Sequence, residues 1–353
     1  MSKRLHSIAI DITNLCNFRC RHCFNDSGEH SREEELTDKE ILALIEEICE
    51  FDTEAVCICG GETMLKKDLV YQIAKFIKKK LGNATSVNVV SNGFLIDEEV
   101  AYNLKKSGID LVQISIDGAK AETHNWLRKN DSSFDKAIQA IRELKKVGMF
   151  VGVACAPSKK NVEEIDDVMT MCHELGVNLF RMQPLMIMGR GRELRNVMLD
   201  EIEYYNLSQK IFANSINPKY KGMQIEWGDP IQHLEAIQDK NYEIRDIHIT
   251  AYGDVMASPY IPLSFGNIKR HSLNEYFKNG LYDVYKDKLF RKMASMMNSW
   301  ENMELNSRNK IFPIIGTEAN INYDLIDLDK RDLEKYNIFW KWRMTDENKT
   351  FNS

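Results

Sequence analysis

Three cysteines stand close together near the start of the chain. Cys16, Cys20 and Cys23 lie within eight residues, in the polar stretch DITNLCNFRCRHCFNDSGEH that follows an apolar run. Thiolates are strong ligands of zinc and of iron–sulfur clusters, and C-x-x-C is a common zinc spacing. A structural zinc site needs four ligands, and only His22 and His30 are further candidates nearby. A cluster held by three cysteines, with one iron left open, fits this count better, and zinc is the alternative.

The overall composition is that of a soluble globular protein. The 353 residues are 43% hydrophobic and 28% charged, which is enough to bury a large core. The net charge is -6 and the basic residues are scattered, so we expect no nucleic-acid partner. The first residues lack a signal-peptide pattern, and no apolar run is long enough to cross a bilayer. We therefore expect a cytoplasmic protein without a membrane partner, whose eight cysteines are reduced.

Short apolar runs alternate with amphipathic helical patterns along the first half of the chain. The predicted strands are HSIAIDI, EAVCIC, SVNVVSN, DLVQISID, MFVGVACA and VNLFRMQPL. This alternation predicts a parallel sheet covered by helices. Six strand–helix units end near Leu185, too few for a complete eight-unit barrel, so the predicted fold class is α/β, a partial (β/α)6 barrel with parallel strands. Thr37 is the predicted N-cap of the first helix, and Gly148 and Gly176 are predicted helix stops.

The rhythm changes in the second half of the chain. We expect a helix over 201–214 and a hairpin with its turn at 252–254, which together indicate a smaller α+β extension. No linker rich in proline or serine separates the two regions. The predicted domains are a partial barrel core, 1–188, and an extension with a helical tail, 189–353.

The cysteine-bearing stretch resembles a known family, the radical S-adenosylmethionine (radical SAM) enzymes. Cys16, Cys20 and Cys23 match the family's C-x-x-x-C-x-x-C signature. The resemblance implies one [4Fe–4S] cluster whose open iron binds the amine and carboxylate of S-adenosyl-L-methionine (SAM). It also implies that the reduced cluster cleaves SAM to a 5'-deoxyadenosyl radical, which removes a hydrogen atom from the substrate. A flavodoxin or ferredoxin is the implied electron donor.

Further matches follow at successive strand ends, in CGGE, SNG and SID. Because active sites of this architecture lie at the carboxyl ends of the strands, these groups should gather in one pocket. Two glycines let the backbone approach a ligand, and the glutamate offers a carboxylate to the methionyl amine. The cofactor contacts implied by the resemblance are Gly60, Gly61, Glu62, Ser91, Asn92, Ser115, Asp117, Arg128 and His22. Taken singly, each of these motifs is as consistent with a turn.

Two of these assignments follow sub-groups of the family. Arg128 sits where some members have an arginine that faces the cofactor carboxylate, and Lys129 replaces the glycine that usually follows. His22 occupies a position that is often aromatic and placed over adenine. The alternative for His22 is a histidine that faces solvent.

The stretch GDVMASPYIPLSFGNIKRHSLNEYF resembles the start of the C-terminal extension called SPASM or twitch. The matching residues are Gly253, Gly266, Asn267 and Ile268. Ala257 and Ser258 stand where the usual cysteine would be, and no cysteine follows Cys172. Thiolates of this region therefore cannot hold an auxiliary cluster, and we expect the extension to serve as a lid or scaffold.

Enzymes with this extension mostly modify ribosomally made peptides or related small metabolites, so a peptide substrate is the first hypothesis and a small polar metabolite the second. Without an auxiliary cluster, a redox-neutral outcome such as epimerisation is favoured over oxidative cross-linking. Cys59 and Cys155 are candidate hydrogen donors, with core packing as the alternative. Cys57, which alternates with Cys59, is expected to point to the opposite face. Arg190 and Arg192 can hold a substrate carboxylate or be solvated. A zinc-binding protein and a non-catalytic scaffold are the remaining alternatives.

Overall fold

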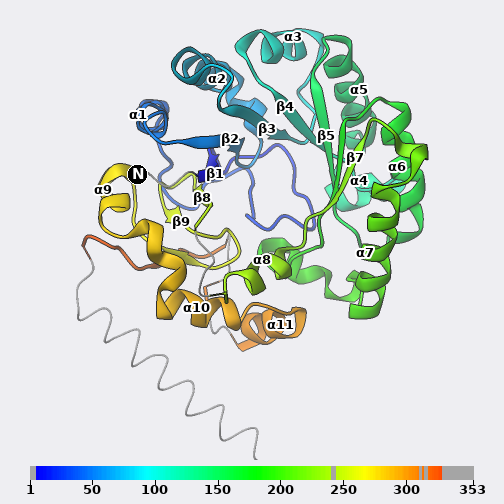
Figure 1. The fold of residues 1–353 in the computed structure, drawn as a ribbon. Helices are drawn as coiled ribbons and strands as arrows, with labels where there is room; N and C mark the ends of the chain where they lie inside the picture. Colours follow the sequence, from blue (N-terminus) through cyan, green and yellow to red (C-terminus); the bar gives the residue numbers. More distant parts are fainter. Residues whose placement is uncertain (1–4, 240–243, 310–311, 314–316, 328–353) are drawn as a thin grey trace, which may run out of the picture.

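The computed structural model describes residues 5–239, 244–309, 312–313 and 317–327 (Figure 1). Its main element is a nine-stranded sheet in the order β7-β6-β5-β4-β3-β2-β1-β8-β9. The strands are β1 (Leu5–Asp11), β2 (Thr53–Cys59), β3 (Ser86–Ser91), β4 (Leu111–Ser115), β5 (Phe150–Cys155), β6 (Leu179–Met182), β7 (Gln224–Trp227), β8 (Asp246–Ile249) and β9 (Val255–Met256). Every neighbouring pair is parallel except β8 and β9, which are antiparallel. The predicted α/β class and the six predicted strands are confirmed.

Helices cover the convex side of this sheet (Figure 1). In β2, Val56 and Ile58 are fully buried, whereas the alternate positions Cys57 and Cys59 are partly exposed. Because successive side chains of a strand point to opposite faces, the apolar half of each strand packs on the helices and the other half lines the interior. The covering helices are α1 (Asp38–Ile48), α2 (Lys67–Leu81), α3 (Glu98–Ser107), α4 (Ala121–Arg128), α5 (Ser133–Lys146) and α6 (Ile165–Glu174).

The helix ends follow the predicted signals. Thr37 caps α1, with its hydroxyl accepting from the Glu40 N–H at 3.2 Å and its own N–H donating to the Glu40 carboxylate at 2.8 Å. Gly148 and Gly176 follow α5 and α6 with φ values of 66° and 74°, which suit glycine. The short helix α4 was not predicted, because its N-cap position holds Lys120, which makes no side-chain cap.

The sheet stays open, so the barrel is partial. Within the part of the chain that the structure describes, β7 and β9 form its two edges and are not paired with each other. Residues after 188 contribute β7, β8 and β9, so the sheet extends past the predicted core. The expected hairpin is the β8–β9 pair, and the expected helix is α7 (Glu201–Ser215). The domain boundary at 188 remains a prediction, and the predicted helical tail beyond residue 327 lies outside the described residues.

The last third of the chain adds short elements (Figure 1). These are α8 (Pro230–Ala236), β10 (Leu263–Ser264), α9 (Leu273–Lys278), α10 (Lys288–Ser295), α11 (Trp300–Asn309) and β11 (Ile321–Asn322). Of these, α8, α10 and α11 lie along the open side and α9 lies beside α1 (Figure 1). Short 3-10 turns lie in the first half of the chain at Thr63–Lys66 and Val162–Glu164, and later at Gly189–Val197, Pro218–Tyr220 and Leu281–Lys286. The strands β10 and β11 pair in parallel as a separate small sheet.

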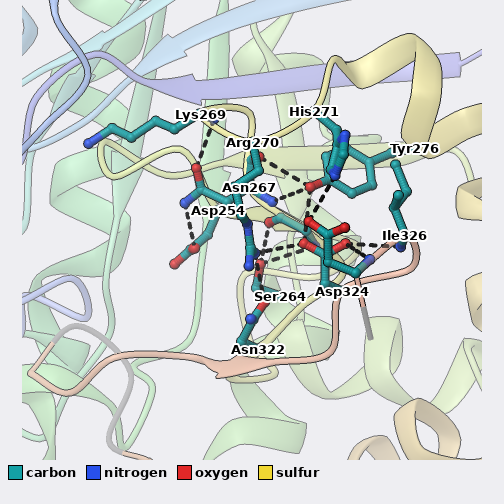
Figure 2. A network of polar contacts seen from close by, with 12 residues as sticks. Asp254, Ser264, Asn267, Lys269, Arg270, His271, Tyr276, Asn322, Asp324 and Ile326 are labelled. Atoms are coloured by element: carbon teal, nitrogen blue, oxygen red, sulfur yellow. Dashed lines mark hydrogen bonds and ion pairs between the residues drawn. The ribbon is translucent and has the colours of Figure 1, made fainter. Parts of the chain in front are cut away.

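A buried polar network holds this region together (Figure 2). The Tyr276 hydroxyl accepts from the Asn267 N–H at 2.9 Å and donates to Asp324 at 3.1 Å. Arg270 pairs with the same Asp324 carboxylate at 2.7 Å. A Cβ on Gly266 would lie 2.1 Å from the Tyr276 ring, so this position requires glycine. The Gly-Asn pair of the extension therefore has a structural role in ordering its turn.

Candidate active site

The three cysteines lie in the loop between β1 and α1, and this loop is closed by its own backbone. The Cys16 N–H donates to the Gly28 carbonyl at 2.7 Å, and the Gly28 N–H donates to the Asn14 carbonyl at 3.1 Å. The two chain segments thus form a bridge at the base of the loop. Cys20 is buried, and Cys16 and Cys23 are half-buried.

Gly60 and Gly61, directly after β2, contact the backbone at the start of this loop. The Gly61 N–H donates to the Thr13 carbonyl at 2.7 Å. A Cβ on Gly61 would lie 2.1 Å from the Leu15 carbonyl oxygen, and one on Gly60 would lie 2.4 Å from the Thr13 carbonyl oxygen. The sequence predicts that the two glycines let a ligand approach the backbone closely. In the structure, the group that approaches them is the backbone of the cysteine loop.

Glu62 joins the ends of β2 and β3. Its carboxylate is buried and accepts from the Ser91 hydroxyl at 2.7 Å, the Asn92 N–H at 2.8 Å and the Met64 N–H at 3.0 Å. Burial raises the pKa of Glu62, while these donors oppose the rise. The Asn92 side chain reaches on to Asn17 in the cysteine loop at 2.8 Å. The CGGE and SNG motifs are therefore brought together beside the cysteines.

Asp117 and Arg128 form a buried ion pair next to the loop. Arg128 Nε donates to Asp117 Oδ2 at 2.6 Å, and its Nη1 lies 3.9 Å from Cys20 Sγ. The other Asp117 oxygen accepts from the Ala156 N–H at 2.9 Å. Burial alone would raise the pKa of Asp117, but the Arg128 charge outweighs it and the pKa is lowered. Ser115, at the end of β4 and two residues before Asp117, is half-buried.

His22 and Lys129 flank this pair. The His22 side chain is only 13% exposed and its Nε2 lies 3.9 Å from Asp117 Oδ2, so it does not face solvent. Burial lowers the pKa of His22 to about 4, and the nearby Arg128 charge adds to the effect, so the ring is neutral at pH 7. Lys129 has a φ of 55° and ψ of 43°, the left-handed conformation that glycine adopts more readily. The chain thus keeps the backbone turn after Arg128 without the glycine.

Arg190, in the segment after β6, binds the backbone of the cysteine loop. Its Nε donates to the Cys20 carbonyl at 2.8 Å across a separation of 170 residues, and its backbone N–H donates to the Cys23 carbonyl at 2.9 Å. Its Nη1 pairs with Asp26 at 2.6 Å, and its Nη2 donates to the Ser27 carbonyl at 2.9 Å. The sequence leaves a solvated or a substrate-binding role open for Arg190, whereas in the structure the Arg190 side chain orders the cysteine loop.

The thiols fit a cluster. Burial raises the pKa of Cys16 to about 12, and the charges of Glu62, Cys20 and Cys23 add to the rise. Burial also raises the pKa of Cys20, and the Arg128 charge opposes it. None of the three is in a disulfide. The raised pKa values mean that it costs free energy to deprotonate these buried thiols. Binding to a metal centre would offset this cost, because metal-bound thiols are deprotonated. Within the described residues, no three Cys, His, Asp or Glu side chains are grouped as ligands of a single ion. Three soft sulfur donors in one ordered loop suit iron–sulfur ligation.

The two candidate hydrogen donors lie on different faces of the sheet. Cys59 is half-buried on the concave face, whereas Cys155 is 1% exposed and shares the helix-covered face with Val151 and Val153. The expectation for Cys57 is wrong. Its Sγ lies 3.4 Å from Cys59 Sγ on the same face, because residues two apart in a strand point the same way.

Sequence reasoning also missed a buried pair at the ends of β1 and β8. His248 Nε2 lies 2.9 Å from Asp11 Oδ2, and burial of His248 is outweighed by the Asp11 charge, so the pKa of His248 is raised. Both residues line a cavity of about 40 Å³ that also touches Asn14 and Asn25 of the cysteine loop. The pair could not be predicted, because β8 joins β1 from more than 200 residues away.

The architecture is that of a partial barrel: an open, mostly parallel sheet with three uncrosslinked thiols in the loop after its first strand. A sequence model of the Radical SAM superfamily matches residues 10–172. A probable GTP 3',8-cyclase of Saccharolobus islandicus is 30% identical over 224 residues, which are 61% of this chain and 70% of that protein. The chain belongs to the radical SAM superfamily. Membership implies a [4Fe–4S] cluster and SAM.

Two further comparisons extend over most of the chain. The AdoMet-dependent heme synthase of Methanosarcina barkeri is 26% identical over 305 residues, 81% of this chain and 84% of that protein. Among solved structures, anSMEcpe with bound AdoMet and the Kp18Cys peptide superposes with a TM-score of 0.62 at 17% identity, over 86% of this chain and 95% of that chain. At this identity the superposition shows the shared fold. Among the described residues, no helix is both long and apolar enough to span a membrane.

Proposed function

We propose that this enzyme uses a SAM-derived radical to remove a hydrogen atom from a peptide and then returns a hydrogen atom, as in an epimerisation. The observation that carries the proposal is the cysteine loop, in which three free thiols are held by contacts from β2, α4 and the segment around Arg190. Cys16, Cys20 and Cys23 are the proposed cluster ligands. When bound, the cluster supplies the electron that cleaves SAM to the 5'-deoxyadenosyl radical.

The chain's own residues would hold SAM around this loop. A carboxylate oxygen can accept more than one hydrogen bond, so Glu62 keeps capacity for the methionyl ammonium although it already binds Ser91 and Asn92. Arg128 uses Nε and Nη1 on protein partners and has further N–H donors for the cofactor carboxylate. His22 is neutral and buried, which suits contact with adenine. The proposed contacts are Gly60, Gly61, Glu62, Ser91, Asn92, Ser115, Asp117, Arg128 and His22.

We assign the extension to the SPASM/twitch type as a scaffold without its own cluster, and we keep the domain boundary at residue 188. The turn at Gly266 and Asn267, ordered by Tyr276, supports this assignment. Ala257 and Ser258 are buried at the position of the usual cysteine. The role left for the extension is to cover the open side of the barrel.

The substrate class has two candidates. The solved structure with a bound peptide favours a peptide, which would be ribosomally made. The similarity to a heme synthase and a GTP cyclase favours a small polar metabolite as the second candidate. For the returned hydrogen atom we favour Cys59 over Cys155, because Cys59 faces the barrel interior. A flavodoxin or ferredoxin is the proposed electron donor, and a cytoplasmic location remains a prediction.

The test is anaerobic turnover in heavy water. Reconstituted protein, SAM and dithionite are incubated with peptides encoded beside its gene, and 5'-deoxyadenosine and peptide masses are measured. We expect matched amounts of 5'-deoxyadenosine and of peptide that carries one deuterium, and neither with the C16A/C20A/C23A variant. Turnover that responds only to a small-molecule extract would replace the peptide by the metabolite. A colourless protein with one bound zinc would refute the radical reaction.

A further inference from the structure

Strand β2 carries two thiols that face the barrel interior as neighbours. The Sγ atoms of Cys57 and Cys59 lie 3.4 Å apart and form a sulfur–sulfur hydrogen bond. Both side chains are half-buried, unlike Val56 and Ile58 between and beside them, which are packed on the helices. Cys59 is followed directly by Gly60, the residue that supports the cysteine loop. The thiol pair therefore sits at the edge of the candidate active site.

Charged groups from three other strands surround this pair. Cys59 is the register partner of Asp11 on β1, and Asp11 is bonded to His248 on β8. Arg181 on β6 acts on Cys57 electrostatically, although β6 lies four positions from β2 in the sheet. This is possible because the sheet curls, so that β6 faces β2 across the interior. Glu226 of β7 pairs with Arg181 at 2.8 Å and offsets part of its charge.

The surroundings separate the proton affinities of the two sulfurs. The hydrogen bond from Cys59 lowers the pKa of Cys57, and the charges of Arg181 and His248 add to the effect. The same hydrogen bond and burial raise the pKa of Cys59. Cys57 is therefore the sulfur that gives up its proton more easily, and Cys59 is the sulfur that keeps its proton and donates it in the hydrogen bond.

We propose that Cys57 and Cys59 act together as one hydrogen-atom donor, in which Cys59 gives the hydrogen and Cys57 stabilises the sulfur radical that remains. This inference rests on the proposed redox-neutral function and identifies the two thiols that return the hydrogen atom. Cys155 and Cys172 act on each other electrostatically, but among the described residues neither they nor Cys49 form a sulfur–sulfur hydrogen bond, and all three lie on or against helices.

The proposed steps balance in atoms and electrons. The Cys59 S–H bond breaks as a C–H bond forms on the substrate radical, which leaves an unpaired electron on the Cys59 sulfur. The Cys57 thiolate adds to this sulfur, and a three-electron S–S bond holds the unpaired electron on both atoms. One electron from the flavodoxin or ferredoxin donor and one proton then restore one thiol and one thiolate. No further reductant is needed, because the same donor class already serves the enzyme.

The first test needs no cofactor and measures the thiols directly. Full-length protein is alkylated with iodoacetamide from pH 6 to 9, and the rate at Cys57 is followed by mass spectrometry. We expect the C59A substitution to slow alkylation of Cys57 at pH 7 severalfold, because the S–H donor that lowers the pKa of Cys57 is lost. The matched control C155A should leave the Cys57 profile unchanged. An identical Cys57 profile in wild type and C59A would overturn the pairing.

The second test separates this inference from the proposed function. Reconstituted protein is given SAM and dithionite in heavy water without added substrate, so that the 5'-deoxyadenosyl radical is quenched by the nearest exchangeable hydrogen. We expect deuterated 5'-deoxyadenosine from wild type and C155S, and loss of the label with C59S. Equal labelling in C59S would overturn the donor role alone. Absence of 5'-deoxyadenosine in the wild type would overturn the proposed function and the donor role with it.

Discussion

The buried Asp117–Arg128 pair allows a structural and a cofactor role of Arg128 to be told apart. The perturbation is R128M, which keeps the length of the side chain and removes its charge. Asp117 is fully buried and Arg128 is 12% exposed, so water cannot replace the lost partner. Removal of one member of such a pair costs about 3–5 kcal/mol, and the Ala156 N–H retained by Asp117 favours the low end. We expect a loss of about 3 kcal/mol in the free energy of unfolding at pH 7.

The loss should depend on pH. In the wild type the pKa of Asp117 is lowered, so its contribution to stability is present above the pKa of the unfolded state, near 3.8, and is lost as the pH falls through the folded pKa. In R128M burial is left to raise this pKa, so the carboxyl protonates more readily. The deficit of R128M relative to wild type should therefore shrink as the pH falls from 7 towards 5.

The assay is urea unfolding of the full-length chain, followed by circular dichroism, for wild type, R128M, D117N and D117N/R128M. We expect the double variant to be more stable than R128M, because the amide leaves no unpaired charge. If Arg128 serves only the cofactor carboxylate, R128M unfolds like wild type before SAM is added. That result, or strictly additive effects in the four proteins, would refute the reasoning.

Three further predictions follow from neighbouring contacts. R190A should loosen the cysteine loop by about 2 kcal/mol and speed its amide exchange about 30-fold, since charged donors to two carbonyls and to the Asp26 carboxylate are lost. The control R192A, for which the described residues provide no ion pair or hydrogen bond, should exchange like wild type. G61A should cost about 3 kcal/mol and prevent iron uptake, because its Cβ meets backbone, and normal iron content would contradict this. H248Q should cost most stability below pH 6.5 and progressively less as the pH rises through the raised pKa of His248. Chemical unfolding at pH 6 and 9 measures this, and an equal deficit at both pH values would argue against the Asp11 pairing.

Much of the fold follows from short-range patterns. The alternation of strands and helices and the cap at Thr37 depend on residues close in sequence, so the six core strands and five of their helices could be predicted. The helix that carries Arg128 was missed because it is short and begins without a capping side chain. The cysteine loop could be placed at the end of β1 by its position in the chain alone.

The contacts that order the site could not be predicted in the same way. Arg190 reaches Cys20 across 170 residues, and nothing in the local sequence around GRG marks its partner. The pair of His248 and Asp11 likewise depends on β8 joining the far side of β1. The error at Cys57 was different, because the alternation of side chains in a strand already places it beside Cys59.

The central claim is that Cys16, Cys20 and Cys23 hold a cluster whose remaining iron is open to SAM. The most direct measurement is electron paramagnetic resonance of the reconstituted, dithionite-reduced protein before and after SAM is added. The account predicts a [4Fe–4S]⁺ signal that changes on addition of SAM and is absent from the C16A/C20A/C23A variant. A signal that ignores SAM, or that persists in the triple variant, would contradict it.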